Sequence, residues 1–60
     1  MPNIVIDGPK LEKQVKAKLV EEITDSVHRL TGIPREHIVV LIKENDPENV
    51  GVGGKLLSER

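Results

Sequence analysis

The chain of 60 residues contains no cysteine and no aromatic residue. Disulfides are therefore excluded, and so is a platform of aromatic rings on which nucleic-acid bases could stack. The longest apolar run, Ile38 to Ile42, is far too short to span a bilayer. Nine basic and ten acidic residues give a net charge of −1, which attracts neither nucleic acid nor an anionic membrane. We expect no nucleic-acid partner and no membrane partner.

The N-terminus also lacks the pattern of a signal peptide, because no basic stretch precedes an apolar one. A cytoplasmic location is the default expectation. Only His28 and His37 could supply nitrogen ligands to a transition metal, and they lack the spacing of a metal-binding pair. Each histidine is more typical of a surface or boundary position, so we expect no metal and no other cofactor.

A chain of this length hides only about 60% of the surface that it exposes when unfolded, so its own core is marginal. Small folds usually compensate with disulfides, a structural metal or oligomerisation. The first remedy is excluded and the second has poor ligands. We therefore expect the chain to form a homo-oligomer.

The first half of the chain predicts a strand followed by a long helix. Residues 3–7 contain a β-branched run that stops at Gly8-Pro9, which is typical of a strand and a turn. Apolar residues recur at steps of three or four from Leu11 to Leu30 and predict an amphipathic helix. Gly32 suits the left-handed position that ends a helix.

The polar face of this helix predicts two ion pairs at a spacing of four residues. These are Glu12 with Lys16 and Asp25 with Arg29, each with the acid first. All other acidic residues are typical of a solvated helix face or a turn.

A second strand is predicted over residues 37–44, which are apolar at consecutive positions. Such a run indicates burial on both faces. Because the chain has one long helix to cover one face, we expect the other face to meet another subunit. Residues 45–49 predict a turn, residues 50–54 a short glycine-rich strand or hairpin, and residues 55–60 a tail with a brief helical pattern.

Together these elements predict a single domain over residues 1–60 with an α/β (α+β) fold. Its parts are a β-α-β unit with parallel strands, joined by a right-handed crossover, and a short C-terminal β-hairpin. Common catalytic motifs are missing. Ser26 and Ser58 have no recognisable nucleophile motif, and the glycines before Lys55 fail the phosphate-loop pattern at Asn49 and Leu56.

The N-terminus carries the remaining candidate for chemistry. Pro2 follows the initiator Met1, and a residue this small at the second position is compatible with methionine removal. The product is a secondary amine attached to a strand. A neutral amine is a competent general base, and burial lowers its pKa toward neutrality. Met-Pro alone is weak evidence, because many proteins begin this way.

Several features coincide, however. A chain near sixty residues begins Met1-Pro2 and runs directly into a strand, and the β-α-β unit that follows ends in Asn49-Val50-Gly51-Val52-Gly53-Gly54. Over essentially its whole length it resembles the 4-oxalocrotonate tautomerase family, the short-chain branch of the tautomerase superfamily. The segments Gly8-Pro9-Lys10 and Glu48 to Gly54 resemble the archaeal-type subgroup.

The resemblance implies a tautomerase-like fold assembled as a homohexamer, a trimer of dimers, with active sites lined by neighbouring subunits. It also implies cofactor-independent isomerase chemistry, the enol–keto tautomerisation of an unsaturated 2-oxo acid such as 2-hydroxymuconate. Pro2 would take a proton from the 2-hydroxyl group of this 2-hydroxydienoic acid and return one to carbon, which needs a pKa near the working pH.

Only some of the family's site residues have a match in this sequence. Pro2 matches the catalytic proline, and Lys10 lies where the family has an arginine after the first strand. Lysine still attracts a carboxylate but lacks the bidentate fork of arginine, and Lys10 could equally be a solvated lysine. Val39 replaces a second arginine, and Val50 replaces an aromatic residue. Both valines could line the substrate site, although core packing also explains Val50.

The loss of the arginine at Val39 leaves the substrate open. Lys43, or Arg35 from a neighbour, could supply the missing charge, or the substrate could carry one carboxylate rather than two. Two other functions stay possible. One is another proline-dependent reaction, the decarboxylation or hydration of a small acid. The other is a non-catalytic oligomer that retains Met1.

Overall fold

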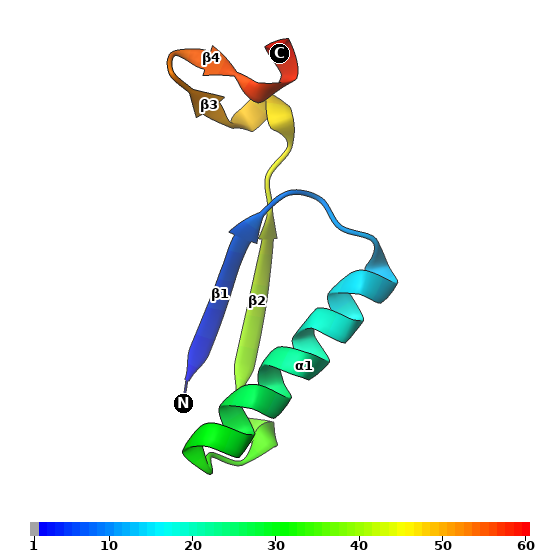
Figure 1. The fold of residues 1–60 in the computed structure, drawn as a ribbon, viewed down its shortest axis with the longest axis vertical. Helices are drawn as coiled ribbons and strands as arrows, with labels where there is room; N and C mark the ends of the chain where they lie inside the picture. The colour runs from blue at the N-terminus through cyan, green and yellow to red at the C-terminus, as the bar shows by residue number, and fades with distance from the viewer. Residues whose placement is uncertain (1) are drawn as a thin grey trace.

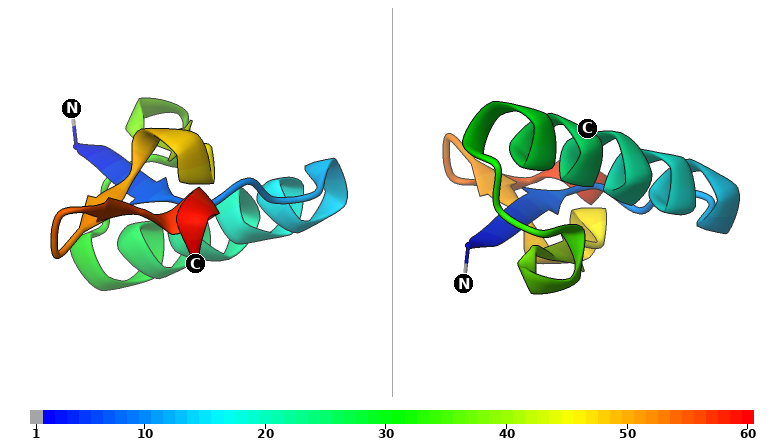
Figure 2. Two further views of the ribbon diagram at one scale, coloured as in Figure 1. Left: turned by 90° about the horizontal axis from the view of Figure 1, so that it is seen from above. Right: turned by 90° about the horizontal axis from the view of Figure 1, so that it is seen from below.

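The computed structural model describes residues 2–60, so the predicted removal of Met1 concerns a residue outside this range. Two strands, β1 (Asn3–Gly8) and β2 (Val39–Glu44), lie parallel, with Asn3 opposite Val39 and Gly8 opposite Glu44. The helix α1 (Lys13–Thr31) connects them and lies along the strand pair (Figures 1 and 2). The predicted β-α-β unit with parallel strands is confirmed.

The two faces of the strand pair differ. Ile4 and Ile6 are half-buried, whereas Val5 between them and Asp7 after them are exposed. Opposed residues of the two strands share a face, because side chains alternate along each strand. The face of Ile4 and Ile6 also carries Glu44, which contacts α1, so this is the face that the helix covers.

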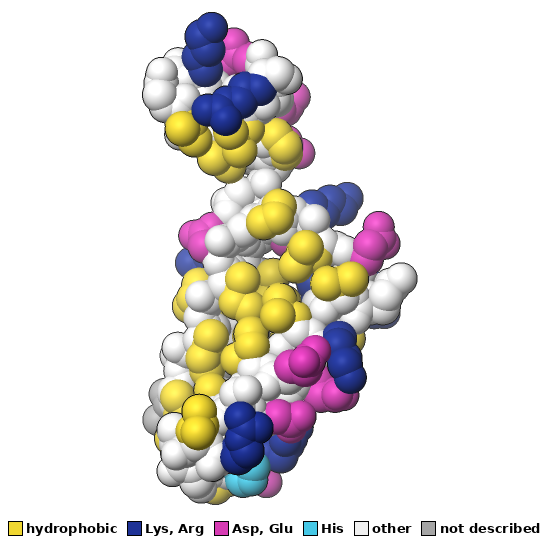
Figure 3. All heavy atoms as spheres, in the orientation of Figure 1, with side chains coloured by type: hydrophobic (Ala, Val, Ile, Leu, Met, Phe, Trp, Pro, Cys, Tyr) yellow, Lys and Arg dark blue, Asp and Glu magenta, His cyan; other side chains and the backbone are white. Residues whose placement is uncertain are grey.

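The opposite face has no cover within the chain. Its apolar side chains include Val5, which is 51% exposed, and Leu41, which is 47% exposed. On the side of the molecule where α1 lies, Figure 3 shows hydrophobic side chains gathered between the strand pair and the helix, with charged side chains along the outer edge of the helix. The sequence of the second strand predicts burial on both faces. Within one chain only one of these faces is covered.

Residues 2–60 of a single chain do not enclose a hydrophobic core. Among residues 2–60 no hydrophobic side chain is fully buried. The radius of gyration is 14.8 Å, whereas a compact domain of this length has a radius of about 10 Å. The fold is extended, and its apolar face is available to another chain.

The two ends of α1 are stabilised in different ways. At the C-terminal end Gly32 adopts the predicted left-handed conformation, with φ 76°, and its N–H donates to the carbonyl of His28 at 2.9 Å. The helix begins at Lys13 rather than Leu11, and the preceding Glu12 makes no side-chain cap. The N-terminal end of α1 is held instead by Glu44 of β2.

Both predicted ion pairs within the helix are wrong. Lys16 pairs with Glu44 of β2 at 3.1 Å, and Asp25 pairs with Arg35 beyond the helix end. Neither Glu12 nor Arg29 takes part in an ion pair within residues 2–60. Tertiary partners win over the local ones because a pair at i,i+4 is worth only a few tenths of a kcal/mol.

The second strand starts two residues later than predicted. His37 belongs to a short 3-10 helix, Arg35–His37, in which its N–H donates to the carbonyl of Pro34 at 3.0 Å. Pro34 disfavours helical conformation at the residue before it, which separates this turn from α1. Val39 is the first residue of β2 that pairs with β1.

The C-terminal segment forms the predicted hairpin. A 3-10 helix, Pro47–Asn49, leads into β3 (Gly51–Val52), which pairs antiparallel with β4 (Lys55–Leu56). Gly53 and Gly54 have φ 63° and 87°, as a two-residue turn with two left-handed positions requires. Lys55 and Leu56 were predicted in the tail and instead complete the hairpin, which projects beyond the strand pair (Figure 1).

After β4 the chain ends in a 3-10 helix, Leu57–Glu59, where the sequence predicted a brief helical pattern. Of the helices between residues 2 and 60, none combines the length and apolar composition that crossing a bilayer needs.

Candidate active site

Pro2 lies at the free end of β1, where its backbone is joined to the start of β2. The residue is half-buried, and its carbonyl oxygen accepts a hydrogen bond from the Val39 N–H at 3.1 Å. Val39 is half-buried as well. The structure therefore brings together Pro2 and Val39, two of the four predicted site residues.

Neither cation predicted to replace the missing arginine offers a free charge beside Pro2 in this chain. The guanidinium of Arg35 is ion-paired with the carboxylate of Asp25 on α1. Lys43 lies opposite Asp7, about 13 Å from Val39 along a strand that rises about 3.3 Å per residue. Of the described residues, neither Arg35 nor Lys43 therefore supplies a free cation beside Pro2 within one chain.

Lys10 and Val50, the other two predicted site residues, lie together at the opposite end of the strand pair. Both line an open groove between the turn after β1 and the segment that leads from β2 into the hairpin (Figure 1). The groove is mostly apolar, and no ion pair within residues 2–60 engages Lys10. The remaining residues that line it are Asp7, Gly8, Pro9, Asn45, Pro47 and Leu57.

The two halves of the predicted site are separated by the length of β1. From Asn3 to Gly8 a strand extends about 17 Å at about 3.3 Å per residue. Figure 1 shows the same separation, with the N-terminus at one end of the strands and the hairpin beyond the other. One chain therefore cannot place Pro2 and Lys10 against the same small molecule.

The Lys10 end is held by Glu44, the last residue of β2. One carboxylate oxygen, Oε2, accepts a hydrogen bond from the Leu11 N–H at 2.9 Å and also pairs with the Lys16 ammonium at 3.1 Å. The Glu44 side chain is 30% exposed. Since Leu11 directly follows Lys10, this contact fixes the peptide unit on the C-terminal side of Lys10.

Asn45 holds the other side of the same turn. Its N–H donates to the carbonyl of Gly8 at 2.8 Å, and its side-chain amide donates to the same carbonyl at 3.2 Å. The amide also donates to the Asp7 carboxylate. The residues that follow β1 are thus fixed to the end of β2 on both sides of Lys10.

Electrostatics at this end favour an ionised Glu44. The Leu11 N–H and the Lys16 side chain hold the pKa of the Glu44 carboxyl below its ordinary value. Partial burial opposes the shift, whereas the charges of Lys16 and Lys10 add to it. Glu44 is therefore an anion that lies within the field of the Lys10 ammonium.

Sequence reasoning missed Glu44 and Asn45 as parts of this region. The backbone groups that they bind, in Leu11 and Gly8, lie more than thirty residues away along the chain, so no local spacing reveals them. The signal in the sequence was the position of these two polar residues at the end of the second strand. In a parallel pair the two strands end at the same edge of the sheet, so residues there lie beside the end of the first strand.

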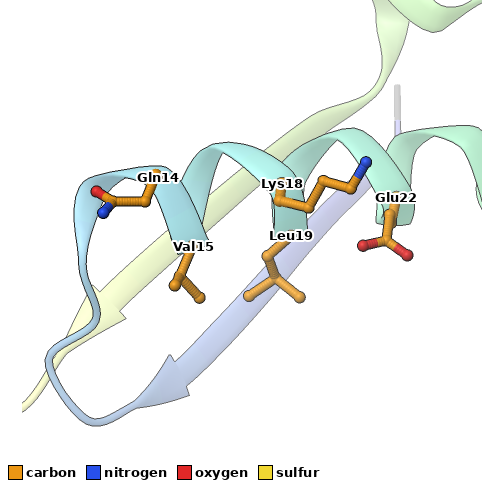
Figure 4. Close-up of a pocket in the computed structure, with 5 residues that line it drawn as sticks. All are labelled: Gln14, Val15, Lys18, Leu19 and Glu22. Carbon is orange, nitrogen blue, oxygen red and sulfur yellow. The ribbon is translucent and has the colours of Figure 1, made fainter.

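A different depression lies on α1 alone and is shown in Figure 4. Val15 and Leu19 point to the same side of the helix, and Gln14, Lys18 and Glu22 form a row beside them. This row includes neither a nucleophile nor a histidine, and its lysine pairs with Glu21 at 3.4 Å. The depression has no group suited to catalysis.

Metal chemistry has no obvious centre here. Within residues 2–60 no three His, Cys, Asp or Glu side chains gather closely enough to hold a metal ion. The groups at the two ends of the strands are instead Pro2 with Val39 at one end, and the Lys10 cation with Val50 at the other.

Comparison with known proteins gives one consistent result. A family model described as tautomerase enzyme matches residues 2–60. A probable tautomerase of Bacillus cereus is 45% identical over 51 residues, which cover 85% of this chain and 82% of that protein. Nearly the whole length of the chain is therefore matched by one family.

Solved structures agree with the sequence relatives. YwhB, a homologue of 4-oxalocrotonate tautomerase, has a TM-score of 0.87 and 33% identity, covering 98% of both chains. DmpI from Archaeoglobus fulgidus has a TM-score of 0.82 and 42% identity, covering 95% of this chain and 98% of that chain. Since a bacterial and an archaeal relative match at similar identity, the archaeal-type subgroup stays a prediction.

Proposed function

The chain belongs to the tautomerase enzyme family, and from this membership we propose that it ketonises 2-hydroxydienoic acids with the amine of Pro2 as the base. The family, the fold and the isomerase class predicted from the sequence are confirmed. The substrate, the base and the assembly are the parts that we propose here.

The reaction moves one proton and leaves the composition of the substrate unchanged. The neutral Pro2 nitrogen takes the proton of the 2-hydroxyl group of 2-hydroxymuconate. The electrons shift along the conjugated chain, and the protonated nitrogen returns a proton to a carbon further along it. One group performs both steps, so its pKa must lie near the working pH.

A neighbouring chain supplies the second half of the site. Its Lys10 holds the substrate carboxylate and stabilises the negative charge that develops on the oxygen. Val39 beside Pro2 and the neighbour's Val50 exclude water from the amine. This apolar surrounding disfavours the protonated amine and lowers its pKa.

The assembly that we propose is a homohexamer, a trimer of dimers. Support comes from the open face with Val5 and Leu41 and from the absence of a fully buried hydrophobic side chain among residues 2–60. The extended shape leads to the same conclusion, because burial between chains is the remaining source of a core.

One observation carries the proposal: Pro2 directly precedes β1 and its carbonyl accepts a hydrogen bond from the Val39 N–H, in a chain that matches the family from residue 2 onward. This hydrogen bond uses the carbonyl of Pro2 and not its nitrogen. Once Met1 is removed, the nitrogen is a secondary amine that can act as a base.

The direct test follows the loss of 2-hydroxymuconate by ultraviolet absorbance, using protein whose loss of Met1 is established by intact mass. We expect a rate far above that of buffer. A matched protein that keeps one extra residue before Pro2 should lose this rate. Equal rates for the two proteins would remove Pro2 from the mechanism.

A second substrate tests the shortage of positive charge near Val39. The compound 2-hydroxy-2,4-pentadienoate has the same enol but a single carboxylate. If Lys10 is the one cation that binds substrate, the two compounds should react with similar kcat/KM. A strong preference for the dicarboxylate would mean that a further cation, such as Arg35 of a neighbour, enters the site.

A further inference from the structure

The turn that carries Lys10 is a short bridge whose two ends are anchored to the same place. On one side Asn45 binds the carbonyl of Gly8 through both its backbone and its side chain. On the other side Glu44 binds the Leu11 N–H. Only Pro9 and Lys10 lie between the two anchors, and Pro9 has a fixed φ.

The Glu44 anchor has no substitute at its end of the bridge. Within residues 2–60 the Leu11 N–H donates to Glu44 and to no backbone carbonyl. The same Glu44 oxygen also holds Lys16, one turn into the helix, at 3.1 Å. A single carboxylate thus ties β2 to the peptide after Lys10 and to the first turn of α1.

We propose that Glu44 is a positioning residue for Lys10: its Oε2 fixes the Lys10–Leu11 peptide and so holds the Lys10 ammonium at the rim of the groove. The inference rests on the proposed function, in which Lys10 binds the substrate carboxylate. Glu44 does not touch the substrate. It acts through the backbone of the residue that does.

This role differs from simple attraction between charges. If charge alone mattered, the Glu44 anion would compete with the substrate carboxylate for Lys10, and its removal would strengthen binding. If positioning matters, loss of the acceptor weakens binding, because a binding group displaced by about 1 Å can cost up to 10²-fold in rate. The two effects have opposite signs, so substitution separates them.

The experiment compares wild type with Glu44→Ala, which removes the acceptor, and with Glu44→Gln, which keeps an acceptor oxygen but no charge. Glu21→Ala is the matched control, because it removes the exposed Lys18–Glu21 pair elsewhere on α1. Two readouts are used: KM and kcat for 2-hydroxymuconate, and the Kd of cis,cis-muconate by calorimetry. Muconate has the same carboxylates but no enol, so its binding needs no turnover.

For Glu44→Ala we expect KM and the muconate Kd to rise about tenfold while kcat changes less than about threefold. Glu44→Gln should restore both constants to within about threefold of wild type, and Glu21→Ala should leave them unchanged. Protection of the Leu11 amide from hydrogen exchange should be lost in Glu44→Ala and kept in Glu44→Gln.

Three results would overturn the inference. These are unchanged or tighter muconate binding in Glu44→Ala, an equal loss in Glu44→Gln, and an equal loss in Glu21→Ala. Failure of the proposed function looks different. In that case wild type does not ketonise 2-hydroxymuconate, while the muconate Kd still reports whether Glu44 positions Lys10.

Discussion

The two ends of the strand pair are built for different tasks. At the Pro2 end the Pro2 carbonyl accepts a hydrogen bond from the Val39 N–H, and the guanidinium of Arg35 is engaged with Asp25. At the Lys10 end Glu44 and Asn45 hold the turn by several polar contacts. The Pro2 end has few polar contacts. At the Lys10 end, several polar contacts hold the turn that carries the cation.

We propose that this difference is the reason why one chain is not a complete site. An apolar surrounding lowers the pKa of an amine, because it disfavours the protonated form. Carboxylate binding needs a fixed cation. The length of β1 keeps these two environments apart in each chain, and we propose that assembly brings opposite ends of different chains together.

The largest effect should come from the Pro2 end. Adding one residue before Pro2 converts a secondary amine into an amide that cannot act as a base. We expect kcat to fall by about 10³-fold, within the range that general acid–base catalysis contributes. Pro2→Ala, which keeps a primary amine, should retain part of the activity. Steady-state kinetics of both proteins at a fixed oligomer concentration check this.

The next effect concerns the open face that lies between the two ends. Leu41→Asp places a charge on this face, and burying an unpaired carboxylate costs several kcal/mol. We expect a smaller particle in sedimentation velocity and the loss of most activity. Gln14→Asp, at an exposed position of α1, is the control and should sediment like wild type. An intact, active Leu41→Asp oligomer would show that this face is not an interface.

A pH titration should report the charge of Glu44 at the Lys10 end of the strand pair. The folded-state pKa of Glu44 is lowered, so its contribution to stability is present above the unfolded-state pKa of about 4.3. The contribution is lost as the pH falls through the lower folded-state pKa. The carboxyl carbon shift of Glu44 in NMR spectra should report the ionised form at pH 5 and titrate with a midpoint below the ordinary glutamate value of about 4.3. A midpoint at or above that ordinary value would contradict this charge state.

The smallest effect is expected at the ion pair near the Pro2 end. Asp25 and Arg35 have side chains that are about half exposed. Their pair should contribute at most about 1 kcal/mol to stability, as exposed pairs do. Urea unfolding of Asp25→Ala measures it at constant protein concentration. A loss several times larger would mean that the pair also holds the 3-10 helix beside β2.

Local sequence patterns predicted the elements that depend on local causes. The period of the apolar residues predicted α1 and the strands, and Gly32 predicted the end of the helix. The glycine-rich segment 50–54 predicted a short strand or hairpin, and the structure places the turn at Gly53 and Gly54. In each case the cause lies within a few residues, such as a left-handed backbone position that glycine tolerates.

Features that depend on distant partners escaped prediction. The start of α1 could not be placed because its anchor, Glu44, comes from the other end of the chain. Lys16 was assigned to Glu12 for the same reason. His37 was placed in a strand because the apolar run beside it gives no sign of the 3-10 turn that follows Pro34.

The candidate site was predictable as a set of residues but not as an arrangement. Pro2, Lys10, Val39 and Val50 were named from a family resemblance, which carries no information on how far apart they lie in one chain. The structure supplies the pairs, Pro2 with Val39 and Lys10 with Val50, and the strand length between them.

The central claim, that each site combines the Pro2 end of one chain with the Lys10 end of another, is tested most directly by subunit mixing. One inactive protein carries an extra residue before Pro2, and the other carries Lys10→Ala. Both are unfolded together in equal amounts and refolded. If the site lies between chains, about a quarter of the sites in random mixed oligomers regain both groups, and activity should rise accordingly. Activity that stays at the sum of the two separate proteins would contradict the shared site.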